Sequence, residues 1–133
     1  MKNLNLAITA GAFYALAGQT ALAESISVNA KSGVKTPVYA FSSYIASNCK
    51  SLALPRVSLP KSKNGKYSSS KYSFRVRAGK PCAGRYIKGM RVFFTSNRGF
   101  RGVERAKIGF NTVQFTDGGG YDYYGVRATI NVR

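Results

Sequence analysis

The sequence predicts an all-β fold, an antiparallel β-sandwich of about seven strands. Several segments alternate apolar and polar residues with the period of two that strands show, and clusters of Gly, Pro, Asn and Ser separate these segments. No segment after residue 23 has an apolar period of 3.6 long enough for a substantial helix. With no repeat and no linker in the sequence, one domain is expected over residues 24–133.

The first 23 residues have the pattern of a secretory signal peptide. Lys2 precedes an Ala-rich apolar run that ends in Ala21-Leu22-Ala23, a small-x-small cleavage pattern, before Glu24. The run is short and polar for a membrane span of roughly 20 apolar residues, so an uncleaved anchor is the less favoured interpretation. We therefore expect an exported protein, periplasmic or secreted, with no transmembrane segment after cleavage.

The C-terminal segment is the clearest predicted strand. Its apolar residues are Val126, Ala128, Ile130 and Val132, and its polar ones are Arg127, Thr129, Asn131 and Arg133. In KYSFRVRA, one face carries Tyr72, Phe74 and Val76 and the other carries Arg75 and Arg77. Extended structure is also expected over the ranges 25–30, 35–46, 90–95 and 105–116.

Cys49 and Cys82 are the only cysteines, and in an exported chain an even number favours a disulfide. A metal site is disfavoured because the sequence has no His, and a redox pair would be closer in sequence. On the chain-entropy model, closing a loop of this length stabilises a fold by roughly 3–4 kcal/mol.

The charge is strongly unbalanced, with 21 Lys and Arg against 4 acids and a net charge of +17. The basic residues are spread along the chain, which indicates a basic face on a folded body. The electrostatic field of such a face attracts polyanions. The alternative interpretation is a solvated surface that has no specific partner. We expect polyanion contact because so large an excess is unusual.

The stretch MRVFFTSNRGFRGVERAKIGF resembles a signature of bacterial Ig-like and cadherin-like domains. In that signature a strand ending in Y-T-P leads into G-F-x-G-x-D-x-F-x-Y. Gly99-Phe100-Arg101-Gly102 matches G-F-x-G, Glu104 takes the acid position, and Ser96 stands where the family has Pro. The resemblance implies an Ig-like sandwich over the whole exported chain.

The same stretch has a physical interpretation as a structural turn made by Gly99, Phe100, Gly102 and Glu104. The glycines permit positive φ, and Phe100 can fold back on the core. Glu104 is expected to accept hydrogen bonds from turn amides or to pair with Arg101 or Arg105.

Catalysis is not expected, and no catalytic residue, metal site or cofactor is predicted. His is absent, and Asp117 and Asp122 flank three glycines in a loop that is more typical of a solvated turn than of paired catalytic carboxylates. Too few acids are present for a good Ca²⁺ site.

Binding is the remaining class of function. Tyr offers contact area at low entropic cost and stacks on sugar faces. The predicted polyanion-binding residues are Arg75, Arg77, Arg98, Arg101, Arg105, Lys107, Tyr121, Tyr123 and Tyr124. One hypothesis is a non-enzymatic Ig-like domain that contacts an acidic glycan, lipopolysaccharide or a similar polyanion, in adhesion or host interaction. The alternative is an envelope or protein-interaction subunit that docks to an acidic protein. No dedicated nucleic-acid module is recognisable.

Overall fold

A computed structural model describes residues 24–113 and 121–133, and these residues form β-strands and no helix. The nine strands are β1 (Glu24–Ala30), β2 (Thr36–Ser42), β3 (Tyr44–Ile45), β4 (Lys50–Ser51), β5 (Arg56–Ser58), β6 (Gly65–Arg75), β7 (Tyr86–Ser96), β8 (Gly102–Val113) and β9 (Tyr121–Val132). Within this part of the chain no helix is available to cross a membrane. The all-β prediction is confirmed, with nine strands where about seven were expected. The expected signal peptide lies outside the described residues.

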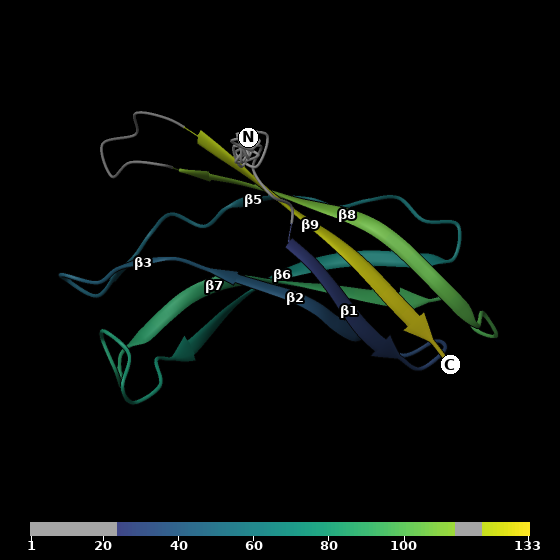
Figure 1. Ribbon diagram of the computed structural model, residues 1–133, viewed down its shortest axis with the longest axis horizontal. Helices are drawn as coiled ribbons and strands as arrows, with labels where there is room; N and C mark the ends of the chain where they lie inside the picture. Colours follow the sequence, from purple (N-terminus) through teal and green to yellow (C-terminus); the bar gives the residue numbers. More distant parts are fainter. Residues whose placement is uncertain (1–23, 114–120) are drawn as a thin grey trace, which may run out of the picture.

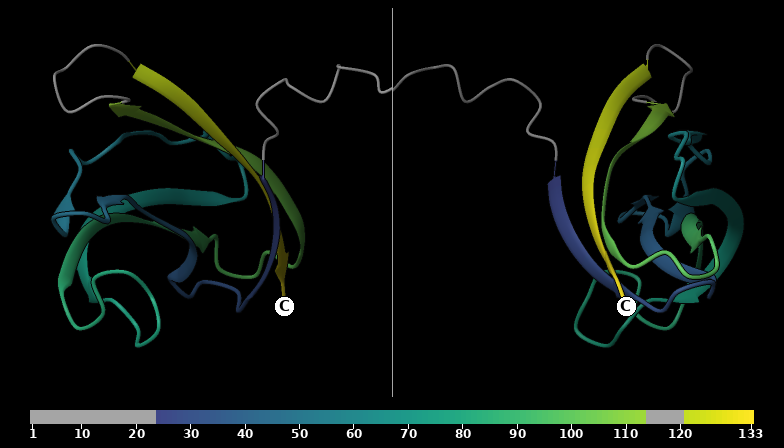
Figure 2. Two further views of the ribbon diagram at one scale, coloured as in Figure 1. Left: turned by 60° about the vertical axis from the view of Figure 1, so that its left-hand side comes forward. Right: turned by 90° about the vertical axis from the view of Figure 1, so that its right-hand side faces the viewer.

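Two sheets face each other (Figures 1 and 2). The first has four strands in the order β1-β9-β8-β5, and the second has three in the order β2-β7-β6. Strands β3 and β4 form a separate, two-stranded sheet. The pairings are antiparallel except between β1 and β9, which run parallel. The sandwich is therefore antiparallel apart from its first strand.

The core lies between the two sheets. In β9 the predicted alternation holds, because Val126, Ala128, Ile130 and Val132 are buried while Arg127 is exposed. From β8 come Ile108 and Phe110, and from β7 come Val92 and Phe94, all four fully buried. Because successive side chains on a strand point to opposite faces, this inward set leaves the intervening polar residues on the outer face of each sheet.

Strand β7 also buries a residue on its other face. Ile87 is fully buried, but it alternates out of phase with Val92 and Phe94 and does not belong to the main core cluster. Its ladder partner is Phe74, whose ring stacks on Tyr72 at 5.7 Å between centroids. Val76 is buried as well. The face predicted for Tyr72, Phe74 and Val76 is thus an apolar patch outside the main core.

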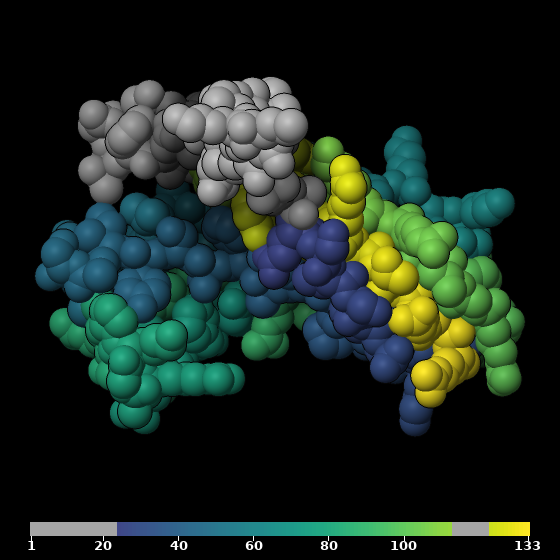
Figure 3. Space-filling model, viewed as in Figure 1, coloured from purple at the N-terminus to yellow at the C-terminus, as the bar shows by residue number. Residues whose placement is uncertain are grey.

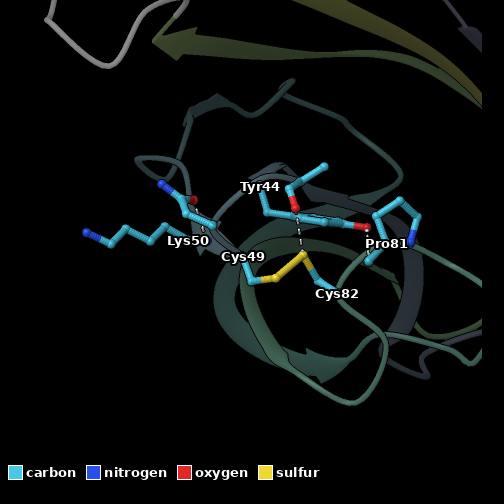
Figure 4. The surroundings of a disulfide bond; sticks show 7 residues. Tyr44, Cys49, Lys50, Pro81 and Cys82 are labelled. Atoms are coloured by element: carbon cyan, nitrogen blue, oxygen red, sulfur yellow. Dashed lines mark hydrogen bonds between the residues drawn. A yellow bond between two sulfur atoms is a disulfide. The ribbon is translucent and has the colours of Figure 1, made fainter.

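The predicted disulfide joins Cys49 to Cys82, with their Cα atoms 5.6 Å apart (Figure 4). It ties the β3-β4 ladder to the β6-β7 connection. The hydroxyl of Tyr44 adds a second tie by donating to the carbonyl of Pro81 at 2.9 Å. Both cysteines have positive φ, 60° at Cys49 and 66° at Cys82. This conformation is unfavourable for a residue with a Cβ, and here the surrounding structure holds it at both ends of the bridge.

The remaining strand predictions agree with the described strands in place but not in extent, and residues 114–116 of the predicted range 105–116 lie outside the described residues. The range 35–46 is divided into β2 and β3 rather than one strand. The segment around Tyr72 belongs to β6, which begins at Gly65, before the start of the predicted segment KYSFRVRA. Strands β4 and β5 were missed because two- and three-residue strands are too short to show a period.

Candidate functional site

The stretch TSNRGFRGVER contains the connection between β7 and β8, residues 97–101. The amide of Phe100 donates to the carbonyl of Asn97 at 3.1 Å, and φ is 85° at Gly99 and 147° at Gly102. Phe100 is partly buried and packs against the core. These contacts make the connection a tight turn that closes one end of the sandwich.

Two other loops are hydrogen-bonded to this turn. Asn97 donates through its amide to the carbonyl of Asn64 at 2.7 Å and through its side chain to the carbonyl of Lys63 at 2.9 Å. The hydroxyl of Ser32 accepts a bond from the Gly99 amide at 3.0 Å. The three loops together carry exposed basic side chains at Lys31, Lys61, Lys63, Arg98 and Arg101, which we call the loop cluster.

Glu104 differs from the expectation drawn from the sequence. It is only 6% exposed, and its carboxylate accepts hydrogen bonds from the side-chain amide of Asn64 and the hydroxyl of Tyr67, both at 3.1 Å. The expected partners, turn amides or a neighbouring arginine, are not its partners among the described residues. Burial, followed by the charge and hydrogen bond of Glu104, raises the pKa of Tyr67 above its usual value.

Glu24 has a similar arrangement at the start of β1. One of its carboxylate oxygens accepts hydrogen bonds from the hydroxyls of Tyr124 and Tyr39, the latter at 2.8 Å. These two hydrogen bonds lower the pKa of Glu24, and the bond from Tyr124 has the larger effect. The pKa of Tyr39 is raised chiefly by burial, and that of Tyr124 chiefly by its bond to Glu24.

The two carboxylates thus interact with tyrosines rather than with cations. In the described part of the chain no Lys or Arg forms an ion pair with Glu24 or Glu104. Among the described residues, the exposed basic side chains are therefore not paired with acids.

A group of three cations lies on the outer face of the four-stranded sheet. Lys107 on β8 is directly opposite Arg127 on β9, and Arg105 is opposite Thr129. On the far side of β9, Ser25 of β1 is opposite Arg127. The three cations are exposed, and together with Ser25 and Thr129 they line an open depression; we call these five residues the basic face. Strands β1, β9 and β8 lie side by side in Figure 3.

Tyr123 lies beside the basic face on the same side of the sheet. Next to the pair Lys107 and Arg127 on this face is a pair of glycines, Gly109 on β8 and Gly125 on β9. The ring of Tyr123 covers Gly109. A Cβ at residue 109 would be 2.8 Å from the Tyr123 ring. The ring remains 51% exposed, and the ammonium of Lys107 is 5.6 Å from its centroid.

The structure distributes the predicted polyanion-binding residues over several places. Arg105, Lys107 and Tyr123 come together on the outer sheet face. Arg98 and Arg101 are in the turn, Arg75 is at the end of β6, and Arg77 is in the β6-β7 connection. Tyr124 is directed to Glu24, and the side chain of Tyr121 is outside what the structure describes.

Sequence reasoning omitted Arg127, Ser25 and Thr129 from the site. The alternation of the C-terminal strand predicts that Arg127 and Thr129 face solvent, and this pattern could have identified them as candidates for the site. Their position beside Lys107 and Arg105 depends on the β8-β9 register, which the alternation does not specify.

Comparisons with known proteins found no matching family, no matching curated protein and no matching solved structure.

Proposed function

We propose that this protein is an exported, non-enzymatic binding domain that contacts polyanionic surfaces, an acidic glycan or lipopolysaccharide, in adhesion or host interaction. The observation that carries the proposal is the separation of charge within the fold. The described carboxylates are bonded to tyrosines, while exposed Lys and Arg side chains remain without acidic partners among the described residues.

This separation favours a ligand over a merely solvated surface. Like charges repel one another within a compact state, and a large net charge destabilises it. Surface acids placed among the cations would relieve this repulsion, but of the two acids whose side chains the structure describes, Glu104 is buried and Glu24 is bonded to two tyrosines. A polyanion relieves the same repulsion on binding and releases its counterions, which adds to affinity.

We also propose that the domain is Ig-like and exported. Two facing sheets and a G-F-x-G turn at one end support the first part. The Cys49–Cys82 bridge supports the second, because disulfides persist mainly in oxidising compartments outside the cytosol.

A second candidate is a protein-interaction or envelope subunit. Strand β6 has eleven residues and is an edge of its sheet, with β7 as its partner among the described strands. An open edge of this length can accept a strand from another chain. Its exposed Lys66 and Lys71 favour an acidic partner.

The experiment compares the oxidised protein on immobilised heparin and on a sulfonate cation exchanger of matched charge density. We expect elution from heparin at clearly higher salt, because arranged contacts add to the general attraction of the net charge. Elution at the same salt from both columns would contradict the proposal. The charge would then be a general surface property, and the protein-interaction candidate would lead.

A further inference from the structure

We propose that the outer face of β1, β9 and β8 is a binding site for an acidic polysaccharide. Arg105, Lys107 and Arg127 contact its sulfate or carboxylate groups, and Tyr123 stacks on a neighbouring sugar ring. This inference rests on the proposed function and adds the location of the site and the class of ligand.

The positions of the cations are the first step. Lys107 and Arg127 are directly opposite on neighbouring antiparallel strands, where Cβ atoms are about 5 Å apart. Arg105 is one row further along β8, about 7 Å away. Like charges in such positions destabilise a sheet, and none of the described carboxylates offsets them on this face. An anion between the three side chains removes this repulsion.

The depression between these cations is the second step. Its lining includes Ser25 on one side and Thr129 beside Arg127, so hydroxyl groups stand next to the charged groups. Guanidinium groups bind carboxylate and other oxyanions through paired donors, and hydroxyls add single hydrogen bonds. The site is open and lies on rigid strands, which suits a group carried on an extended chain rather than an enclosed small molecule.

Tyr123 is the third step. Two facing glycines, Gly109 and Gly125, leave a flat area on the sheet, and the ring lies on it. A ring supported in this way loses little freedom on stacking against a ligand. The need to cover a glycine explains why an aromatic ring is at position 123. It does not explain why three cations occupy the two neighbouring residue pairs on the same face. The combination of a supported ring and neighbouring cations fits an anionic sugar chain.

The polar residues around the basic face select among polyanions. The outward positions of β1 and β9 carry Ser27, Asn29 and Asn131, and the Asn131 side chain donates to the Ser27 hydroxyl at 3.3 Å. Hydroxyl and amide groups both donate and accept, as sugar hydroxyls do, whereas phosphates only accept. Inserted apolar side chains strengthen binding to a lipid surface, and Val103, at 49% exposed, is the one large exposed aliphatic residue described on this face. These features favour a polysaccharide over nucleic acid or a bilayer.

The test uses two triple variants of the oxidised protein that remove equal charge. The first is Arg105→Gln, Lys107→Gln and Arg127→Gln on the basic face, and the matched control is Lys63→Gln, Arg98→Gln and Arg101→Gln in the loop cluster. Affinity for a heparin oligosaccharide is measured by titration across a range of salt. We expect the first variant to bind the heparin oligosaccharide about 100-fold more weakly than the parent does. The control variant should lose no more affinity for heparin than it loses for the sulfonate exchanger. Urea midpoints no lower than that of the parent show that both variants fold.

A third variant, Tyr123→Leu, tests stacking while a side chain still covers Gly109. We expect affinity to fall about five- to tenfold with no change in the slope of log affinity against log salt, because no charge is removed. Tyr123→Phe should retain most of the affinity.

Two results would overturn this inference and leave the proposed function intact, provided that the parent protein still prefers heparin over sulfonate. The first is an equal loss of heparin affinity in the two triple variants. The second is a Tyr123→Leu variant that binds heparin as tightly as the parent does. Equal competition by single-stranded DNA of the same charge, or tighter binding to anionic lipid vesicles, would reject the polysaccharide as ligand. Equal elution from heparin and sulfonate by the parent would instead reject the proposed function itself.

Discussion

The side chain of Tyr67 on β6 reaches across the sandwich to Glu104 on β8, and its hydroxyl donates a hydrogen bond of 3.1 Å to the buried carboxylate. The ring of Tyr67 also packs against Phe94, with centroids 4.7 Å apart. One residue therefore joins the core and a polar contact between the two sheets. Because Glu104 is 6% exposed, water cannot readily replace this bond.

We expect Tyr67→Phe to lower the free energy of unfolding by about 1–2 kcal/mol, because it removes a hydrogen bond to a charged acceptor and leaves the ring in place. Glu104→Ala should cost more, about 2–3 kcal/mol, because it also removes the partner of Asn64. Urea unfolding of each variant measures these values. Glu104→Gln, which keeps an acceptor oxygen, should be milder than Glu104→Ala. An equal loss in the two Glu104 variants would contradict this order and would show that the charge and second acceptor oxygen, which Gln lacks, account for the whole contribution.

Glu24 is expected to make stability depend on acidity. The hydroxyls of Tyr124 and Tyr39 lower its pKa in the folded state, so the ionised form favours folding. The contribution is present above the unfolded pKa of about 4.3 and disappears as the pH falls through the folded value. The stability difference between the parent and Glu24→Gln should therefore be present near pH 6 and absent near pH 2. A difference that does not change over this range would contradict the assignment.

Removal of the disulfide by Cys49→Ser and Cys82→Ser should lower the free energy of unfolding by about 3–4 kcal/mol, because the bridged cysteines are 33 positions apart. The loss of hydrogen-exchange protection should begin in the β3-β4 ladder and the β6-β7 connection. The β8-β9 ladder should lose protection only with global unfolding. Tyr44→Phe, which removes the neighbouring bond to Pro81, should cost about 1 kcal/mol. Uniform loss across the molecule would argue against a local role for the bridge.

Gly65 is expected to be less replaceable than the glycines of the β7-β8 turn. A Cβ at residue 65 would be 2.3 Å from the carbonyl oxygen of Thr95 and 2.7 Å from the Cα of Ser96, and neither backbone atom can move freely. Gly65→Ala should cost about 3 kcal/mol or more. Gly99→Ala has open space and only a positive φ of 85° against it, so its cost should be about 1 kcal/mol. Thermal and urea unfolding of the two variants decide the order.

Much of the fold was present in local patterns of the sequence. The alternation of Val126, Ala128, Ile130 and Val132 predicted both a strand and its buried face, because the side-chain period of a strand is a property of the backbone. The two cysteines predicted their own pairing because no other pairing was available. Charge and the G-F-x-G stretch predicted the basic surface and the turn from residue types alone.

The site depended on contacts between distant segments, which local patterns do not contain. The register of β8 with β9 put Arg127 beside Lys107, and the parallel pairing of β1 brought Ser25 to the same place. Arg105, in the same stretch as Arg98, was separated from it because it follows the turn on a strand and points outward. The tertiary structure also assigned Glu104 to Tyr67, because packing of the two sheets set which buried groups meet. Residue types and their local order determined the strands, the disulfide and the excess of positive charge, whereas strand register and sheet packing decided which of those charges share a face.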